Sequence, residues 1–182
     1  MITHKGTVRL HTERLRIRRF VMSDSITMYK NYAADERVAR FLSWEAYKNA
    51  DDIQAFLSAQ IDSYKHLNKY HWAIDFNSEI IGSISVISLD ERNHSCEMGY
   101  CLGYDFWNMG ITSEALRAVI GFLFNEVNVH RVMAKHAVDN PASGKVMLKC
   151  NMTYEGRLRE HYYQDNGTYS DSLVYGILRS EF

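Results

Sequence analysis

The hydrophobic period of the chain changes between residues 96 and 126, and this change restricts the fold more than any other feature of the sequence. Apolar residues alternate with other residues from Cys96 to Leu102, which predicts a strand. From about Gly110 to Glu126 they recur at helical spacing instead. A strand that gives way to a helix across a glycine predicts a mixed α/β fold, in which the helix packs on a sheet.

The chain before this junction predicts one strand, two helices and a hairpin. Leu15 and Ile17 alternate with arginines at positions 14, 16 and 18, so we expect a half-buried first strand with the arginines on one solvated face. Ser23 and Asp24 are expected to cap a first helix, and Asn49 a longer second one. The hairpin is predicted from two strand patterns and the residues between them, namely Tyr70 to Asp75, Asn77-Ser78 and Ile80 to Ile87.

The chain after the junction predicts a strand, a helix and a final pair of strands. Residues 131 to 138 alternate and end just before Asn140 and Pro141. Asparagine is a strong N-cap residue and proline is favoured at the first helical position, so a helix is predicted to start there and to stop at Asn151. The final elements are Tyr154 to Tyr163, a turn at Asp165-Asn166-Gly167, and Tyr169 to Leu178. No repeat or linker interrupts this order, so a single domain over residues 1–182 is expected.

Charge and cysteine usage narrow the classes of protein to which the chain can belong. Lys and Arg total 21 against 22 Asp and Glu, a formal net charge of -1, so we expect no nucleic-acid partner. The longest apolar run covers only residues 118–124, which predicts no membrane association. Three cysteines without paired spacing favour a reducing compartment. We therefore expect a cytoplasmic protein. Its oligomeric state is left open, with a homodimer among the options.

The junction itself carries the strongest chemical signal. A glycine between a strand and a helix lets backbone N–H groups turn outward, and the helix start adds partial positive charge, so the run predicts a phosphate or pyrophosphate site. Neither a Walker lysine nor a G-x-G-x-x-G pattern is present. The alternative is a plain strand-to-helix turn. The run comprises Trp107, Asn108, Met109, Gly110, Ile111, Thr112, Ser113, Glu114 and Ala115.

This W-x-x-G-x-T-S-E-A-L run resembles the coenzyme A pyrophosphate loop of the GNAT superfamily of N-acetyltransferases, in particular the ribosomal-protein-alanine N-acetyltransferase branch. Four further motifs match in order: T-E-R-L-R-I-R, E-M-G-Y, D-N-P-A-S and Y-E-G-R-L-R. The resemblance implies the GNAT fold, a mostly antiparallel sheet flanked by helices and splayed between the fourth and fifth strands. It also implies acetyl-CoA as cosubstrate and no metal.

The resemblance assigns site residues position by position. Tyr100 and Leu102 would pair with the pantetheine arm through their backbone, and Trp107 opens the pyrophosphate loop that Asn108, Met109, Gly110, Ile111, Thr112 and Ser113 form. Asn140 and Ser143 would lie beside the thioester, and Lys145 and Lys149 could reach the adenosine phosphates; for Lys149 a simple role at a helix C-terminus is favoured. Asn108 and Thr112 depart from the family pattern. The branched Thr112 would either crowd the phosphate or donate a hydrogen bond to it.

Acetyl transfer from a thioester needs a neutral amine, an oxyanion donor and a proton for the leaving thiolate. Glu97 is the candidate base, against a surface glutamate, and Ser143 the candidate proton donor or water orienter, against a helix-capping serine. Cys96 and Cys101 lack a paired histidine and are not expected to be nucleophiles. Histidines 130 and 136 are expected to be strand residues rather than metal ligands.

The predicted function is acetyl-CoA-dependent N-acetylation by direct attack in a ternary complex. The expected acceptor is a protein N-terminus, as in a ribosomal protein. One alternative acceptor is a small amine, either a polyamine or an antibiotic. A second alternative is a coenzyme A binding module without catalysis, which the departures at Asn108 and Thr112 motivate.

Overall fold

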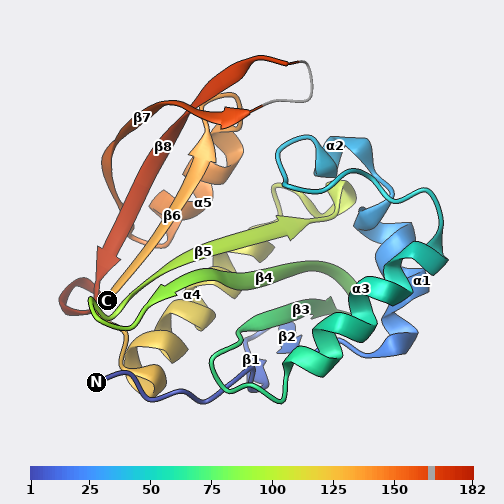
Figure 1. Ribbon diagram of the computed structural model, residues 1–182, viewed down its shortest axis with the longest axis horizontal. Helices are drawn as coiled ribbons and strands as arrows, with labels where there is room; N and C mark the ends of the chain where they lie inside the picture. The colour runs from blue at the N-terminus through green and yellow to red at the C-terminus, as the bar shows by residue number, and fades with distance from the viewer. Residues whose placement is uncertain (164–166) are drawn as a thin grey trace.

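The computed structural model describes residues 1–163 and 167–182 and contains one eight-stranded sheet with helices on both faces (Figure 1). The strand order is β1-β2-β3-β4-β5-β6-β8-β7, and every neighbouring pair is antiparallel except β5 and β6. The predicted mixed α/β class is confirmed. The strands are β1 (Leu10–His11), β2 (Leu15–Arg18), β3 (His71–Phe76), β4 (Glu79–Asp90), β5 (Ser95–Leu102), β6 (Arg131–Ala137), β7 (Thr153–Tyr163) and β8 (Tyr169–Leu178).

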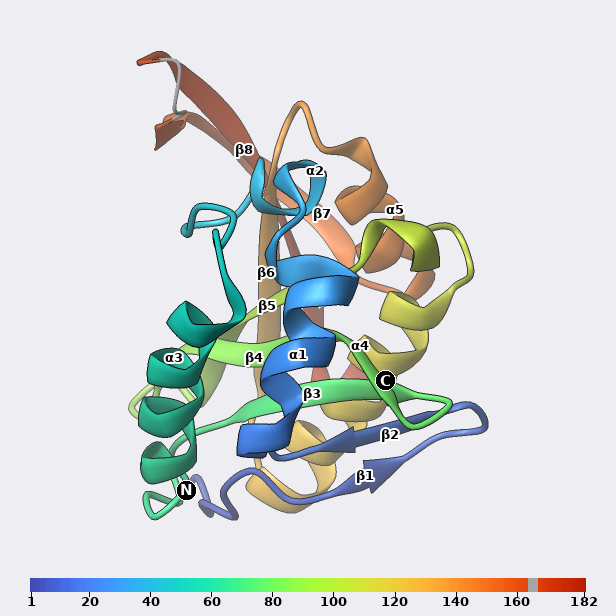
Figure 2. The same cartoon turned by 90° about the vertical axis from the view of Figure 1, so that its right-hand side faces the viewer.

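The helices form two layers that bury different faces of the sheet (Figure 2). On one face α1 (Ser25–Met28) and α3 (Ala50–Ser63) pack over Cys101 of β5, with the short α2 (Glu36–Ala39) beside them. On the other face α4 (Ile111–Phe122) and α5 (Pro141–Lys149) cover an apolar cluster that includes Met98. Of the described helices, none has the length and apolar character needed to cross a membrane.

The sheet opens between β5 and β6. Their parallel pairing ends at Met98 and Ala134, although β5 continues to Leu102 and β6 to Ala137. In Figure 1 the two strands diverge from this point. The predicted splay between the fourth and fifth strands is this one, since the short strand β1 shifts the numbering by one.

Local signals place several turns and helix ends as predicted. Asn77 and Ser78 both have positive φ (53° and 69°), which a two-residue hairpin between β3 and β4 requires. Asn49 caps α3 by accepting a hydrogen bond from Asp52 N at 3.0 Å. Asn151, just after α5, has φ 61°, the left-handed conformation that ends a helix.

The predicted solvated face of arginines on the first strand is wrong for Arg18. Its guanidinium makes two hydrogen bonds of 2.9 Å to Asp24 and one of 2.9 Å to Asp75, both of them buried carboxylates. The predicted cap changes with it, because the Asp24 carboxylate is held by Arg18 and by Val21 N rather than capping α1. A buried charge needs a partner, and this pairing supplies it.

One predicted turn falls mostly outside the described residues. The segment Asp165-Asn166-Gly167 includes two residues that the structure does not describe, and only Gly167, with φ 81°, belongs to the described chain. The strands β7 and β8 on either side of it are paired as predicted.

Candidate active site

The loop from Trp107 to Gly110 turns the chain from β5 into α4 through two left-handed residues. Asn108 has φ 61° and Gly110 has φ 76°. Gly110 is the N-cap residue of α4, and no described side chain accepts a hydrogen bond at this helix start. The first N–H groups of a helix have no partner within the helix, so α4 presents uncapped backbone donors together with the positive end of its dipole.

The polar side chains in the first turn of α4 and the indole of Trp107 are turned away from solvent or bound within the protein. Thr112 and Ser113 in the first turn of α4 are buried, at 9% and 8% exposure. The indole of Trp107 folds back and donates to the carbonyl of Leu102 at 2.7 Å. That bond ties the loop to the end of β5 and gives a physical reason for tryptophan at the first position. It also occupies part of the Leu102 carbonyl that the resemblance assigns to pantetheine.

Glu97 lies on β5 beside the last parallel pair and is held by a lysine that the sequence analysis missed. Lys135 of β6 places its Nζ 3.0 Å from one carboxylate oxygen of Glu97 and 3.2 Å from the other. The Glu97 side chain is only 14% exposed. Glu97 is therefore not the free surface glutamate considered as the alternative. The signal in the sequence was an alternating position on β6, which does not reveal its partner.

Tyr100 and Ser143 meet across the opening of the sheet. The Tyr100 hydroxyl lies 2.9 Å from Ser143 Oγ and donates to the Ser143 carbonyl at 3.2 Å. Asn140 caps α5 by accepting from Ser143 N at 3.4 Å, with Pro141 at the first helical position. Burial raises the pKa of the Tyr100 phenol well above its ordinary value, so this hydroxyl keeps its proton at neutral pH.

Glu97 and Tyr100 lie on opposite faces of β5. Side chains alternate along a strand, so Glu97 shares a face with Cys101, which packs under α1 and α3. Met98 and Tyr100 share the other face, where α4 and α5 lie. The structure thus brings Tyr100, Asn140 and Ser143 together, and it keeps Glu97 on the far side of the same strand.

Of the remaining predicted binding residues, Ile111 is completely buried and can contribute only its backbone, whereas the others are accessible from solvent. Met109 is 45% exposed and Trp107 is 36% exposed. Lys145 and Lys149 are exposed along α5, with Lys149 in its last turn, where a cation is favourable in any protein.

The cysteines and His136 fit the expected structural roles, whereas His130, which was predicted to be a strand residue, lies just before β6. Burial raises the pKa of the Cys96 thiol to about 12, so a thiolate is disfavoured there, and burial also raises the pKa of Cys101. His136 is buried against Tyr175, and its Nδ1 lies 2.8 Å from the Ala137 carbonyl. Among residues 1–163 and 167–182, no three His, Cys, Asp or Glu side chains form a group that could hold a metal ion.

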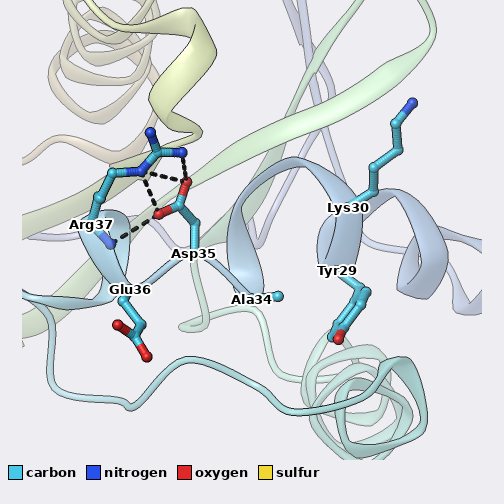
Figure 3. Close-up of a pocket in the computed structure, with 6 residues that line it drawn as sticks. All are labelled: Tyr29, Lys30, Ala34, Asp35, Glu36 and Arg37. Carbon is cyan, nitrogen blue, oxygen red and sulfur yellow. Dashed lines mark hydrogen bonds and ion pairs between the residues drawn. The ribbon is translucent and has the colours of Figure 1, made fainter.

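A hollow of about 440 Å³ opens beside the segment that joins α1 to α2 (Figure 3). Its lining carries two cations and two anions, and Asp35 is already paired with Arg37 at 2.6 Å. Arg37 also lies over the Tyr104 ring, 3.6 Å from its centroid, and Tyr104 packs against Trp107. The hollow is thus connected to the loop through one aromatic pair, although none of the predicted site residues lines it. The lining residues are Tyr29, Lys30, Ala34, Asp35, Glu36 and Arg37.

Residues 14–153 match the family model of the acetyltransferase (GNAT) domain, which includes the loop, the opening of the sheet and both helix starts. The chain belongs to the GNAT acetyltransferase family. The resemblance of the sequence motifs is confirmed, and the protein is an N-acetyltransferase.

Relatives within this family differ in the acceptors that their names state. The chain is 28% identical to the uncharacterized N-acetyltransferase YoaA of Bacillus subtilis (strain 168), over 93% of this chain and 96% of the relative. It is 34% identical to the ribosomal-protein-serine acetyltransferase of Escherichia coli (strain K12), over 74% and 75%. It is 22% identical to the spermidine N(1)-acetyltransferase of Vibrio cholerae (serotype O1, strain ATCC 39315 / El Tor Inaba N16961), over 76% and 78%.

Solved structures share the fold. The crystal structure of a GNAT-family acetyltransferase from Bacillus anthracis superposes with a TM-score of 0.82, over 96% of this chain and 100% of that chain, at 24% identity. The eight-stranded sheet and its flanking helices are therefore an arrangement that this family adopts.

Proposed function

We propose that the protein transfers the acetyl group of acetyl-CoA to the N-terminal α-amine of a protein by direct attack. The observation that carries the proposal is the placement of Glu97 and Ser143 on opposite faces of β5, at the point where β5 and β6 part. In a direct transfer the amine nitrogen adds to the thioester carbonyl carbon, and the thiolate leaves from the tetrahedral centre that results. The amine must lose a proton and the thiolate must gain one, so a base and a separate proton donor on opposite faces of β5 suit this transfer.

The uncapped start of α4 supports acetyl-CoA as the donor. Backbone N–H groups of residues 108 to 113 would hold the pyrophosphate, and the backbone of Tyr100 and Leu102 would pair with pantetheine along the edge that β5 exposes beyond Met98. Lys145 would add a charge for the adenosine phosphates. Glycine at position 110 meets the requirement for a left-handed residue at the loop.

The pair of Glu97 and Lys135 supports the role of Glu97 as base. Two contacts of 3.0 and 3.2 Å show that this carboxylate accommodates an ammonium group at hydrogen-bond distance. An acceptor amine that displaces Lys135, or reaches Glu97 through one water, would place its nitrogen within reach of the carboxylate. The neutral nitrogen attacks the carbonyl carbon, its extra proton passes to Glu97 as the C–N bond forms, and the C–S bond breaks to release the thiolate. Glu97 then returns this proton to water.

Ser143 is proposed as the donor to the leaving thiolate, with Tyr100 as its partner. Ser143 gives its Oγ proton to sulfur and regains one from water. The Tyr100 phenol stays protonated because burial raises its pKa, and it holds Ser143 in position at hydrogen-bond distance from Oγ. Asn140 fixes the first turn of α5 and thereby the position of Ser143.

The protonation state of the acceptor favours an α-amine over a polyamine. A free α-amine has a pKa near 7.7 to 8.0 and a lysine amine one near 10.4, so at pH 7.5 roughly a third of the first but only about a thousandth of the second is neutral. A polyamine acceptor therefore needs strong assistance from carboxylates.

An acceptor comparison tests the proposal. Initial rates at pH 7.5 would be measured with an alanine- or serine-initiated peptide, with the same peptide N-terminally blocked and carrying one internal lysine, and with spermidine. We expect the free N-terminus to be acetylated at least about ten-fold faster than either other amine. Faster acetylation of spermidine or of the internal lysine would overturn the assignment of acceptor.

The second candidate is acetylation of a small amine. The spermidine N(1)-acetyltransferase relative favours it, because that enzyme shares the family at 22% identity. In that case the same comparison gives the opposite order, with spermidine as the better acceptor.

A further inference from the structure

The segment that precedes β2 reaches across the molecule to the loop before α4. Arg14 Nε donates to one carboxylate oxygen of Glu114 at 2.7 Å, and Arg14 N donates to the other at 3.1 Å. Thr12 Oγ1 donates to that second oxygen at 2.5 Å and accepts from Leu15 N at 3.0 Å. Every hydrogen bond named here to the Glu114 carboxylate therefore comes from residues 12 to 14, about 100 positions earlier in the chain.

Arg14 also holds the loop directly. Its Nη1 donates to the carbonyl of Met109 at 3.1 Å, and its Nη2 would lie 3.7 Å from a Cβ atom at Gly110. In a trans peptide the carbonyl and the following N–H point in opposite directions. Fixing the Met109 carbonyl toward Arg14 therefore fixes the Gly110 N–H on the side away from Arg14.

The same arginine connects both ends of the first turn of α4. Glu114 N donates to the Gly110 carbonyl at 3.1 Å, so the backbone of Glu114 closes the turn while its side chain is bound by Arg14. Left-handed glycines are conformationally permissive, and a loop with φ 76° at Gly110 needs outside contacts to hold one orientation. Arg14 contacts the loop at Met109 and the helix at Glu114, on either side of that glycine.

We propose that Arg14 is a positioning residue that orients the backbone donors of the loop toward the pyrophosphate of acetyl-CoA. This inference rests on the proposed function, since it assumes that the loop binds the pyrophosphate. Partly exposed ion pairs contribute little to folding stability, and Arg14 is 38% exposed. Its loss is therefore expected to change ligand affinity more than stability.

The experiment compares two ligands and four variants. Dissociation constants for coenzyme A and for pantetheine, which lacks the pyrophosphate, would be measured by calorimetry for the wild type, Arg14→Met, Arg14→Lys, Glu114→Gln and Arg131→Met. Arg131 is a matched control, because it is also partly buried and forms an ion pair, with Glu155. It is the first residue of β6 and does not belong to the loop. Melting temperature and kcat at saturating acetyl-CoA would be recorded for each variant.

We expect Arg14→Met to weaken coenzyme A binding by roughly ten-fold and to leave pantetheine binding and kcat within about two-fold. Arg14→Lys should recover part of the affinity, because a lysine can still reach one of the two partners. Glu114→Gln should weaken coenzyme A binding by less than Arg14→Met, because the Arg14 bond to Met109 remains. Arg131→Met should bind both ligands as the wild type does.

Two outcomes would overturn the proposal, and each can be told apart from failure of the proposed function. If Arg14→Met binds coenzyme A as the wild type does, or loses affinity equally for pantetheine, Arg14 does not orient the loop. If the wild type itself binds coenzyme A no more tightly than pantetheine, the loop does not hold the pyrophosphate. That result would contradict the proposed function, whatever the Arg14 variants show.

Discussion

The helices α4 and α5 contact each other on one face of the sheet, but their N-termini are built in opposite ways. At α4 the N-cap residue is Gly110, and no described side chain caps the helix. At α5 the side chain of Asn140 accepts from Ser143 N, and Pro141 removes a further donor. One helix start keeps its donors for a ligand, whereas the other uses its own residues to fix Ser143. The start of α4 would thus bind the cosubstrate, whereas the start of α5 would position the residue that takes part in acetyl transfer.

The largest expected effect comes from a substitution at Gly110, at the uncapped start of α4. Gly110→Val is expected to abolish detectable acetyl-CoA binding, because a β-branched residue is strained at φ 76° and its side chain would block approach of the pyrophosphate. Calorimetry of the folded variant would measure this. Gly156→Val is the matched control, since a Cβ at Gly156 meets nothing within 4 Å. Wild-type affinity in Gly110→Val would rule out the loop assignment.

A substitution at the capped start of α5 should lower turnover rather than acetyl-CoA affinity. Ser143→Ala is expected to lower kcat by about 30-fold and to leave the dissociation constant for acetyl-CoA nearly unchanged, because the proton donor is lost while α4 is intact. Tyr100→Phe keeps the Ser143 hydroxyl and should cost less. Steady-state kinetics with a binding measurement would check both variants, and an unchanged kcat in Ser143→Ala would contradict the proposed role.

Glu97→Gln tests the chemistry on the other face of β5. The rate should fall about three- to ten-fold at pH 7.5, and the loss should shrink toward pH 9, where an α-amine with pKa near 8 is already neutral. The control is Lys135→Met, which breaks the same ion pair but keeps the carboxylate. A pH profile of both variants with an alanine-initiated peptide would measure this. A defect that is equally large at pH 9 would show that Glu97 does not act as the base.

The smallest effect is expected at Thr112 in the first turn of α4. Its side chain is buried, so Thr112→Ala should change the dissociation constant for acetyl-CoA by less than about three-fold. A loss beyond about 1 kcal/mol, the scale of a net hydrogen bond, would show that its hydroxyl serves the phosphate. Thr112→Ser keeps the hydroxyl and removes the methyl group, so comparing the two variants by calorimetry separates hydrogen bonding from crowding.

Features with a local cause could be predicted from the sequence. Asn140 and Pro141 favour a helix start through local interactions, and Asn77 and Ser78 both have the positive φ of a two-residue turn. The splay was predicted through the family resemblance, because periodicity gives strands but not the point at which two of them part. The loop before α4 was predicted from its glycine.

Pairings between distant residues could not be predicted from the sequence. Arg18 and Asp75 are 57 positions apart, and Arg14 and Glu114 are 100 apart. An alternating arginine gives the same sequence pattern whether it faces water or a buried aspartate, so the pattern predicted that Arg18 faces solvent. Lys135 was missed for the same reason, since its partner Glu97 lies on another strand.

The comparison of the two helix starts depends on one claim, that α4 binds the pyrophosphate through its uncapped backbone. The direct test is calorimetry of the wild type with coenzyme A and with pantetheine, repeated on Gly110→Val. We expect the wild type to bind coenzyme A at least about 100-fold more tightly than pantetheine, and Gly110→Val to remove this difference. Equal affinity of the wild type for the two ligands, or a difference that survives in Gly110→Val, would contradict it.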